Sequence, residues 1–328
     1  MAVHKIIGIV VCIAIGFGVV FFGTAVQNDW LFRATTLTML AVSWNLMANA
    51  GLVSLGHSAF WGVGSYATVL SMNKFGLPFG VGFIPALVAG ALLGVFLAAT
   101  TGRLRGIFFA ISTLALSEGL RVMALMLPQV TGGAAGIFLN NSLRPPPWVL
   151  YFTGFFGAVL CILIAYILSR SRFHYASRGM RANELVVQML GVDPRRYRFG
   201  VMAISGAMAS FAGAVYACYG GYLEPELAFS LHFTILSQIA PILGGIHTLA
   251  GPVLGSAAII FISEVTRIWL GNREGWSLLI YGLILVICIM FMRDGILGVW
   301  RDIIRRGAGS KRSDPTTLSR DAVAETPR

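Results

Sequence analysis

Two short segments of the sequence place a glutamate and an arginine three residues apart inside long apolar stretches. Glu118 and Arg121 form one pair, and Glu264 and Arg267 form the other. This spacing puts both members on one face of a helix, so we expect each glutamate to pair with its arginine. Charged side chains within a membrane are costly and are functional candidates by default. Near the end of a span they can instead extend to the interface, which we favour for Arg267, whereas both interpretations stay open for Glu118.

Signatures of enzymes that carry their own nucleotide or metal chemistry are missing from the sequence. Three lysines are present: Lys5, Lys74 and Lys311. None ends the glycine-rich loop that cradles nucleotide phosphates, so any ATP-driven motor must be another subunit. No zinc-protease or hydrolase-elbow motif occurs. An intramembrane hydrolase would have to combine Ser65 with His232 or His247, and it is retained only as an alternative.

The composition explains why these charges stand out. The chain has 328 residues, of which 57% are hydrophobic and 11% are charged, against about 25% charged in soluble domains. Mean hydropathy is +0.80. These values indicate a polytopic membrane protein and exclude a soluble enzyme, a nucleic-acid-binding module and a disulfide-stapled secreted domain. Four cysteines lie in apolar runs, where we expect small buried side chains: Cys12, Cys161, Cys218 and Cys288.

The apolar stretches predict an all-α bundle of about ten transmembrane helices. A crossing needs about 20 apolar residues, and seven stretches qualify: Ile6–Val26, Gly80–Ala99, Ile107–Leu127, Trp148–Leu168, Phe199–Tyr222, Gly251–Trp269 and Trp276–Met292. Three others are shorter or interrupted by glycine: Ala34–Val53, His57–Met72 and Phe233–Ile246. Treating the last two as broken or re-entrant helices would leave eight crossings.

Positive charge sets the expected orientation. The net charge of +11 comes from 24 Lys and Arg against 13 Asp and Glu, and basic loops stay on the cytoplasmic side. Ten crossings put Lys5, Arg103, Arg105, the loop 170–198 and the residues after Arg293 on that side, so both termini are expected in the cytoplasm. We expect residues 1–306 to form the membrane domain and residues 307–328 a disordered cytoplasmic tail.

Glycines gather beside two of the three shorter stretches. One group adjoins His57–Met72 and the other adjoins Phe233–Ile246: Gly51, Gly56, Gly62 and Gly64, then Gly244, Gly245, Gly251 and Gly255. Small residues permit close helix packing. Paired short, glycine-interrupted segments are also typical of transport pathways, which we favour for these two groups.

The loop 170–198 contains a pattern typical of a short amphipathic helix. Within Ser177–Val192, Leu185, Val186, Met189 and Leu190 are spaced as one apolar face, and Gly191 can end the helix. A short cytoplasmic helix of this kind suits a groove on a soluble partner. It could instead lie on lipid headgroups. The partner is favoured because the chain lacks a motor of its own.

Four segments in the same order carry a resemblance to a known family. They are Gly51–Tyr66, Leu104–Ala115, Thr131–Ile137 and Leu243–Gly255. These segments resemble the permease subunits of branched-chain amino-acid ABC transporters. The sequence departs from the family pattern at Ala182–Glu184, at Val186–Val187 and at Thr248–Ala250. The departures keep the substrate open, because related importers take urea, short amides or aromatic acids.

The resemblance implies an importer in the bacterial inner membrane. An extracytoplasmic binding protein would deliver the solute, two homologous permease subunits would form the path, and two cytoplasmic ATPase subunits would drive it, with ATP on those subunits and no cofactor in this chain. The resemblance assigns five residues to ATPase coupling: Arg178, Gly179, Arg181, Glu184 and Gly191. A rival interpretation is a proton-coupled transporter that uses Glu118 or Glu264.

The expected substrate path follows the family segments and the scarcity of charge. Small polar, glycine and aromatic residues would offer a weakly binding route that alternates between the two sides. The residues are Ser54, Ser58, Phe60, Gly62, Gly64, Ser65, Tyr66, Ser112, Thr113, Gly244 and Gly245.

Overall fold

The computed structural model describes residues 18, 23–102, 104–270, 279, 280, 282, 283, 286 and 295–298. Most of the predicted spans Ile6–Val26 and Trp276–Met292 therefore lies outside the described residues. Lys5, Cys12, Arg103, Cys288, Arg293 and the predicted tail 307–328 also lie outside them.

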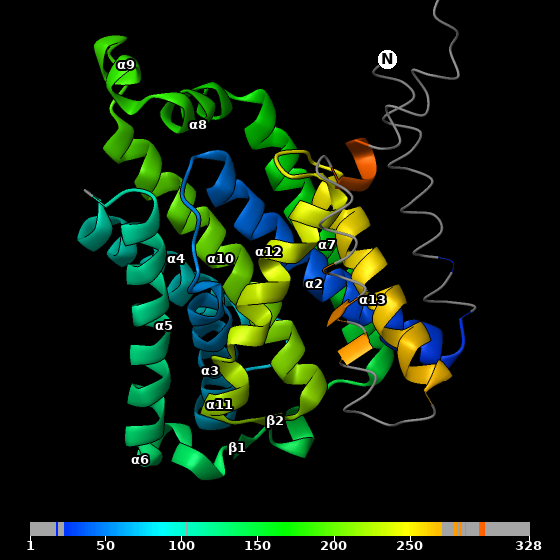
Figure 1. Cartoon of the computed structure of the whole chain (residues 1–328). Coiled ribbons are helices and arrows are strands. Elements are labelled where there is room, and N and C mark those ends of the chain that lie inside the picture. Colours follow the sequence, from blue (N-terminus) through cyan, green and yellow to red (C-terminus); the bar gives the residue numbers. More distant parts are fainter. Residues whose placement is uncertain are drawn as a thin grey trace, which may run out of the picture.

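Long helices make up nearly all of the described chain (Figure 1). Eight of them have 15 or more residues: α2 (Ala25–Asn49), α3 (His57–Phe75), α4 (Phe83–Thr101), α5 (Ile107–Met126), α7 (Pro147–Arg170), α10 (Pro194–Gly220), α12 (Leu231–Gly245) and α13 (Gly251–Trp269). The all-helical prediction is confirmed for this part of the chain. Each of the eight overlaps one of the predicted spans.

Short elements close the two ends of the bundle (Figure 1). At one end lie α8 (Arg172–Ala182) and α9 (Glu184–Met189). At the other lie α6 (Pro128–Thr131), η1 (Gly133–Ala135), η2 (Asn141–Leu143) and α11 (Pro225–Ala228), together with the strands β1 (Ile137–Phe138) and β2 (Tyr222–Leu223). The strands pair antiparallel, with Ile137 opposite Leu223. The loop 170–198, predicted on the cytoplasmic side, thus lies at the opposite end of the bundle from these strands and short helices.

Six helical stretches of the described chain are long and apolar enough to cross a membrane: Phe83–Thr101, Ile107–Met126, Pro147–Arg170, Pro194–Gly220, Pro225–Gly245 and Gly251–Trp269. They support a multi-pass membrane protein. The total of ten crossings and the side of both termini stay predictions.

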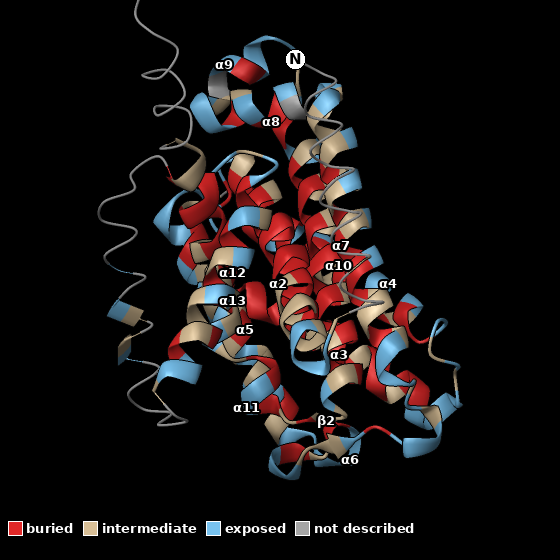
Figure 2. Ribbon diagram, turned by 90° about the vertical axis from the view of Figure 1, so that its right-hand side faces the viewer, coloured by how far each residue is buried: buried red, intermediate tan, exposed pale blue. Residues whose placement is uncertain are grey.

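Helices α2 and α3 are less apolar because they lie inside the bundle. Figure 2 shows buried residues concentrated on α2 and α10. The buried polar side chains of α2 bond within the protein, as when Thr36 Oγ1 donates to the Phe32 carbonyl at 2.9 Å and Ser43 Oγ donates to the Leu40 carbonyl at 2.6 Å. Protein neighbours, rather than lipid, therefore surround this helix, and hydroxyl side chains are tolerated there.

Glycine allows α3 and α4 to approach α10 closely. A Cβ on Gly64 would lie 2.0 Å from the Ser210 carbonyl oxygen, and one on Gly94 would lie 2.2 Å from that of Met202. Neither position can hold a larger side chain without moving a helix. The two cysteines within the described residues, Cys161 and Cys218, are unpaired and buried, as predicted.

Candidate functional site

A non-helical segment enters the middle of the bundle between α2 and α3. Figure 1 shows this connection, residues 50–56, running from the α8–α9 end down to the start of α3. At its inner end, a Cβ on Gly56 would lie 1.8 Å from the Thr113 carbonyl oxygen of α5. Thr113 is about 9 Å along α5 from its first residue, at 1.5 Å per residue. Irregular backbone at membrane depth requires protein or water around it.

Side chains from three helices bond to the backbone of this segment and of the first turn of α3. The Leu55 amide donates to Thr113 Oγ1 at 2.9 Å, and the Ser58 amide donates to Thr234 Oγ1 of α12 at 2.9 Å. Trp44 of α2 donates its indole N–H to the Ser54 carbonyl at 3.0 Å. The chain can therefore leave the helical pattern here without leaving these donors and acceptors unpaired.

Three hydroxyl groups meet at the first turn of α3, and we call Ser58, Ser117 and Thr234 the hydroxyl cluster. Ser58 Oγ lies 2.8 Å from Ser117 Oγ, and Thr234 Oγ1 donates to Ser58 Oγ at 2.9 Å. All three residues are at most 2% exposed. The cluster joins α3, α5 and α12 at the positive end of the α3 dipole. Neutral hydroxyls at a helix start can bind a polar solute weakly, without trapping it.

Only one member of the hydroxyl cluster, Ser58, was a predicted site residue. Two further predicted residues, Ser54 and Thr113, bond in the adjoining connection: the Ser54 carbonyl accepts from Trp44, and Thr113 Oγ1 accepts from the Leu55 amide. Ser117 and Thr234 were missed as site residues. Each lies inside an apolar stretch of the sequence, where an isolated hydroxyl residue was the available signal.

Other predicted path residues on α3 pack against neighbouring elements. Ser65 Oγ donates to the carbonyls of Trp61 at 2.9 Å and Gly213 at 3.0 Å. A Cβ on Gly62 would lie 2.4 Å from the Phe229 ring, on which Tyr66 stacks at 6.0 Å. The Ser65 proton is thus committed to backbone carbonyls in the described part of the chain, which does not support a hydrolase built on Ser65.

Two more predicted path residues make similar close contacts within the bundle. Phe60 is 1% exposed, and its carbonyl accepts a hydrogen bond from Ser210 Oγ at 2.7 Å. Gly64 meets the same residue of α10, as described above. A path role for these α3 residues, Ser58 included, stays a prediction.

The predicted residues on α5 and α12 outside the hydroxyl cluster occupy different settings. Ser112 is partly exposed and donates to the Phe108 carbonyl of its own helix at 2.8 Å. Gly244 and Gly245 are the last two residues of α12, just before the turn into α13. A Cβ on Gly244 would lie 1.8 Å from the Gly251 carbonyl oxygen, and Gly245 has a φ of 127° that favours glycine.

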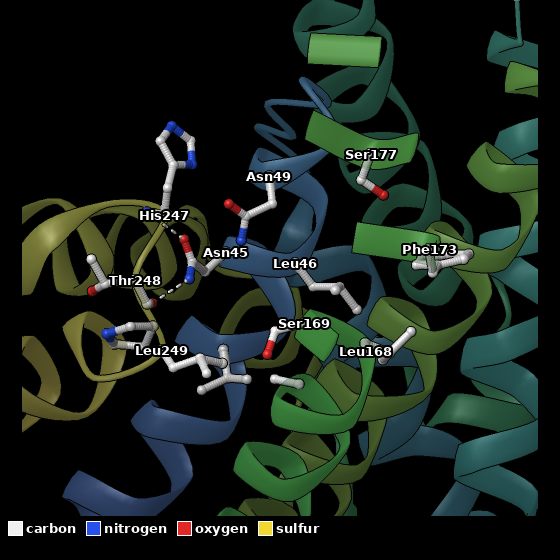
Figure 3. A pocket seen from close by; sticks show the side chains of 13 residues that line it. Asn45, Leu46, Asn49, Leu168, Ser169, Phe173, Ser177, His247, Thr248 and Leu249 are labelled. Carbon is white, nitrogen blue, oxygen red and sulfur yellow. Dashed lines mark hydrogen bonds between the residues drawn. The ribbon is translucent and has the colours of Figure 1, made fainter. Parts of the chain in front are cut away.

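The turn after α12 closes a small pocket at the α8–α9 end of the bundle (Figure 3). Asn45 of α2 accepts from the His247 amide at 3.1 Å and donates to the Thr248 carbonyl at 2.9 Å. The pocket has a volume of about 50 Å³ and includes Ser177 in its lining. Burial, together with the positive charges of Arg181 and Arg178, lowers the pKa of His247.

Both glutamate–arginine pairs form as predicted. Glu118 Oε2 lies 2.8 Å from Arg121 Nε, and Glu264 Oε2 lies 2.6 Å from Arg267 Nη2. Arg121 also contacts Glu226 of α11 at 2.5 Å, a partner that the sequence analysis missed. The Glu118 side chain is 46% exposed, whereas that of Glu264 is 5% exposed.

The predicted coupling segment consists of two helices rather than one continuous helix. The prediction of an unbroken helix over Ser177–Val192 was wrong at Asn183, whose extended backbone, with φ −162° and ψ 110°, separates α8 from α9. The break lets α9 fold back, because Gly179 leaves room for Val187: a Cβ there would lie 2.7 Å from Val187 Cγ2. Gly191, with a φ of 79°, follows α9 in the left-handed conformation expected of a helix stop.

The outward face of α9 is apolar and exposed. Val186 is 51% exposed, Met189 87% and Leu190 77%. Three of the four residues predicted to form one apolar face are therefore open to a partner. The side chain of the fourth, Leu185, lies outside the described set.

The predicted coupling residues do not all share that outward face. Arg181 lies beside the start of the connection 50–56, where a Cβ on Gly51 would be 3.3 Å from Arg181 Cα. Arg178 is exposed. Glu184 points inward: its Oε2 lies 2.9 Å from Arg105 Nε and 3.1 Å from Arg198 Nη2.

Comparisons with known proteins agree on one family. The family model "Branched-chain amino acid transport system / permease component" matches residues 27–289. The permease protein LivM of the high-affinity branched-chain amino acid transport system of Escherichia coli K12 is 27% identical over 314 residues, spanning 85% of this chain and 72% of that protein. The autoinducer 2 import system permease protein LsrC of Salmonella typhimurium LT2 is 25% identical over 319 residues, spanning 92% and 90%.

A solved structure, PsaBC from Streptococcus pneumoniae in complex with Fab, aligns with a TM-score of 0.46 and 14% identity over 84% of this chain and 95% of that chain.

Proposed function

The chain belongs to the family of branched-chain amino acid transport permease components, and we propose that it forms part of the solute path of an ATP-driven importer of branched-chain amino acids. Members of this family are ABC transporter permeases, so the chain is a transport subunit and a multi-pass protein of the bacterial inner membrane. ATP binding and hydrolysis are assigned to separate subunits, and no cofactor is assigned to this chain.

The observation that carries the proposal is the interrupted start of α3. A discontinuous helix whose first turn lies inside the bundle is typical of solute sites in transporters. Here that turn presents hydroxyls from Ser58, Ser117 and Thr234, each at most 2% exposed. A zwitterionic amino acid could form hydrogen bonds with them without meeting a fixed charge. Because the cluster is buried in this conformation, solute entry requires α5 or α12 to move away from α3.

Helix α12 is suited to such movement. It contains Pro241, which removes one backbone hydrogen bond from the helix interior. Phe229 and Ser230 separate it from α11, so this crossing is also discontinuous. We propose that α12 shifts during alternating access and that Thr234 changes its hydrogen-bond partners as it does so.

Partner subunits are assigned to three surfaces. The ATPase would contact the exposed apolar residues of α9, and the binding protein would contact the opposite end, around α6 and the β1–β2 strands. The pair Glu118–Arg121 and its partner Glu226 lie on an exposed face of α5 and α11. Charges at membrane depth avoid lipid, which supports a second permease subunit, or the aqueous path, against this face.

The decisive measurement is uptake by right-side-out proteoliposomes that contain the permease pair, the ATPases and enclosed ATP. Radiolabelled leucine should accumulate only with ATP and the loaded binding protein. Thr234→Val removes a hydroxyl at nearly constant volume and should impair uptake. Thr153→Val is the matched control and should not impair uptake, because Thr153 of α7 lies outside the cluster and donates to the Val149 carbonyl of its own helix at 2.7 Å.

Other outcomes would redirect the proposal. Because the chain also resembles an autoinducer 2 permease, that compound should be tested beside urea, short amides and aromatic acids. ATP-dependent uptake of one of these without leucine would keep the mechanism and change the solute. Uptake that follows a proton gradient, ignores ATP and is lost in Glu118→Gln or Glu264→Gln would contradict the ATP-driven proposal.

A further inference from the structure

Among the described residues, an ionic contact joins the coupling segment to the bundle, and we call its three members the Glu184 clamp: Glu184, Arg105 and Arg198. The Glu184 side chain is 12% exposed and that of Arg198 is 8% exposed, whereas Arg105 is 59% exposed. Glu184 is the first residue of α9, on the side opposite to the exposed Met189. This glutamate therefore contacts the permease and not the surface offered to a partner.

Arg198 uses its donors on three acceptors at once. Its Nη1 donates to the carbonyls of Gly102 at 2.9 Å and Leu104 at 3.3 Å, and its Nη2 donates to Glu184. The last carbonyls of a helix lack partners within it, so Arg198 caps the end of α4 from the first turns of α10. A planar guanidinium can make this set of bonds, and a lysine ammonium cannot reproduce its geometry.

Glu184 supplies the negative charge that balances the buried guanidinium of Arg198. An arginine held 8% exposed among carbonyls needs a carboxylate to balance it. Arg105 brings the connection just before α5 to the same carboxylate. A single side chain of α9 thus links the end of α4, the start of α5 and the start of α10.

Other described links of the coupling segment to the bundle are apolar. Buried Met180 of α8 and Val187 of α9 join the hydrophobic core that also contains Leu52. The described contact between α8 and the α2–α3 connection at Gly51 is a van der Waals contact of 3.3 Å or more. The ionic link leads from α9 directly to Arg105, just before α5, and to Arg198 of α10, so a push on α9 reaches both helices. Helix α5 carries Thr113 and Ser117, which hold the start of α3 through hydrogen bonds of 2.9 and 2.8 Å.

We propose that Glu184 is a positioning residue that transmits ATPase movement through Arg105 and Arg198 to α5 and so to the hydroxyl cluster. The inference rests on the proposed function, because it assumes an ATPase that acts on α9. It separates two roles within the coupling segment: apolar residues of α9 contact the motor, and Glu184 carries the displacement into the membrane.

The test is the amount of solute imported per ATP hydrolysed, measured in the complete reconstituted transporter. Glu184→Gln keeps the size of the side chain and removes its charge. We expect solute per ATP to fall about tenfold, within the range typical of coupling between sites, while ATP hydrolysis persists. Asp193→Asn is the matched control, because Asp193 pairs with Arg196 at 3.3 Å in the same loop but both side chains are more than half exposed. It should leave the ratio unchanged.

A second variant covers failure of Glu184→Gln to assemble. Arg105→Gln removes the exposed member of the Glu184 clamp and should lower the ratio by a smaller factor. If either assembled variant of the clamp imports and hydrolyses at the wild-type ratio, the inference is overturned and the proposed function stands. If the unmodified transporter shows no ATP-dependent uptake, the proposed function fails and the inference fails with it.

Discussion

The segments Ser117–Arg121 and Ser263–Arg267 share a Ser-Glu-x-x-Arg pattern and present opposite residues to the bundle. In α5, Ser117 is 2% exposed and the Glu118 side chain is 46% exposed. In α13, the Glu264 side chain is 5% exposed, and Ser263 is partly exposed. One residue step rotates a helix by about 100°, so the same pattern delivers a hydroxyl inward from one helix and a carboxylate inward from the other.

The neighbours of each helix account for this difference. Helix α13 packs against α2, where Arg33 interacts electrostatically with Glu264. Arg33 also pairs with Asp29 at 2.9 Å, and Asp29 accepts a hydrogen bond from the Tyr219 hydroxyl of α10. The α13 pair therefore faces a neighbouring helix that carries an ion pair of its own. The α5 pair meets α11 at an open face, so identical spacing supports a structural role in one place and a contact surface in the other.

The largest expected effect comes from removing the buried carboxylate. Glu264→Gln should destabilise the permease by about 2 kcal/mol, because the buried side chain loses the negative charge that forms its ion pair with Arg267. Glu118→Gln should cost under about 1 kcal/mol, because its pair is exposed. Thermal inactivation of the detergent-solubilised protein, followed by loss of the monodisperse peak, compares the two variants. Equal losses would contradict the assigned difference between the pairs.

For the serines that precede the two glutamates, the larger loss of stability should come from α5 and the smaller one from α13. Ser117→Ala breaks the contact with Ser58 inside the hydroxyl cluster and should cost about 1 kcal/mol. Ser263→Ala should stay within about 0.5 kcal/mol of the unmodified protein, as is usual for sites away from buried contacts. The same thermal measurement applies. A larger loss for Ser263→Ala would show that the two helices are not rotated as described.

Replacing Arg121 tests whether the open face of α5 is a contact surface. Arg121→Gln removes the cation that joins Glu118 to Glu226. It should change the stability of the isolated subunit by less than about 1 kcal/mol, because Arg121 is partly exposed and both glutamates are exposed, so solvent screens their contacts. If this face meets a second permease subunit, co-purification of that subunit should weaken. Unchanged recovery of the pair together with unchanged leucine uptake would remove this face from the proposed interface.

The smallest expected effect is a pH dependence of stability that arises from His247 rather than from either glutamate–arginine pair. The folded protein holds the pKa of His247 below its ordinary value of 6.5 through burial and through Arg181 and Arg178. The unfolded chain then binds a proton first, so this residue should lower stability as the pH falls through about 6.5 toward the folded pKa. In His247→Gln, the midpoint of thermal inactivation between pH 7.5 and pH 5.5 should fall less than in the unmodified protein. An identical slope in both would exclude this source.

Local features were predictable because they depend on short spacing and on composition. Helix positions followed from apolar length, and both ion pairs followed from a spacing of three residues. The stop at Gly191 followed from the freedom of glycine to adopt a left-handed backbone. The break at Asn183 was not predictable from the apolar pattern, because it depends on Val187 packing back onto Gly179.

Long-range partners explain the rest of what the sequence analysis missed. Nothing in the sequence near Ser117 indicates that Ser58 will lie 2.8 Å away, and Glu226 reaches Arg121 across 105 positions of sequence. The inward orientation of Glu184 likewise depends on Arg198 and on the end of α4. Such contacts are set by how helices rotate and pack, which a pattern along one helix does not encode.

The connection at residues 50–56 also has a consequence for how the protein is completed during synthesis and membrane insertion. The Ser58 amide can form its hydrogen bond only after Thr234 has been synthesised, 176 residues later in the chain. At bacterial synthesis rates of about 5–20 residues per second, this interval is roughly 9–35 s. Until α12 emerges, the newly made α3 holds an incomplete first turn within or beside the insertion machinery. The centre of the permease is thus begun early in synthesis and completed only after more than half of the chain has been made.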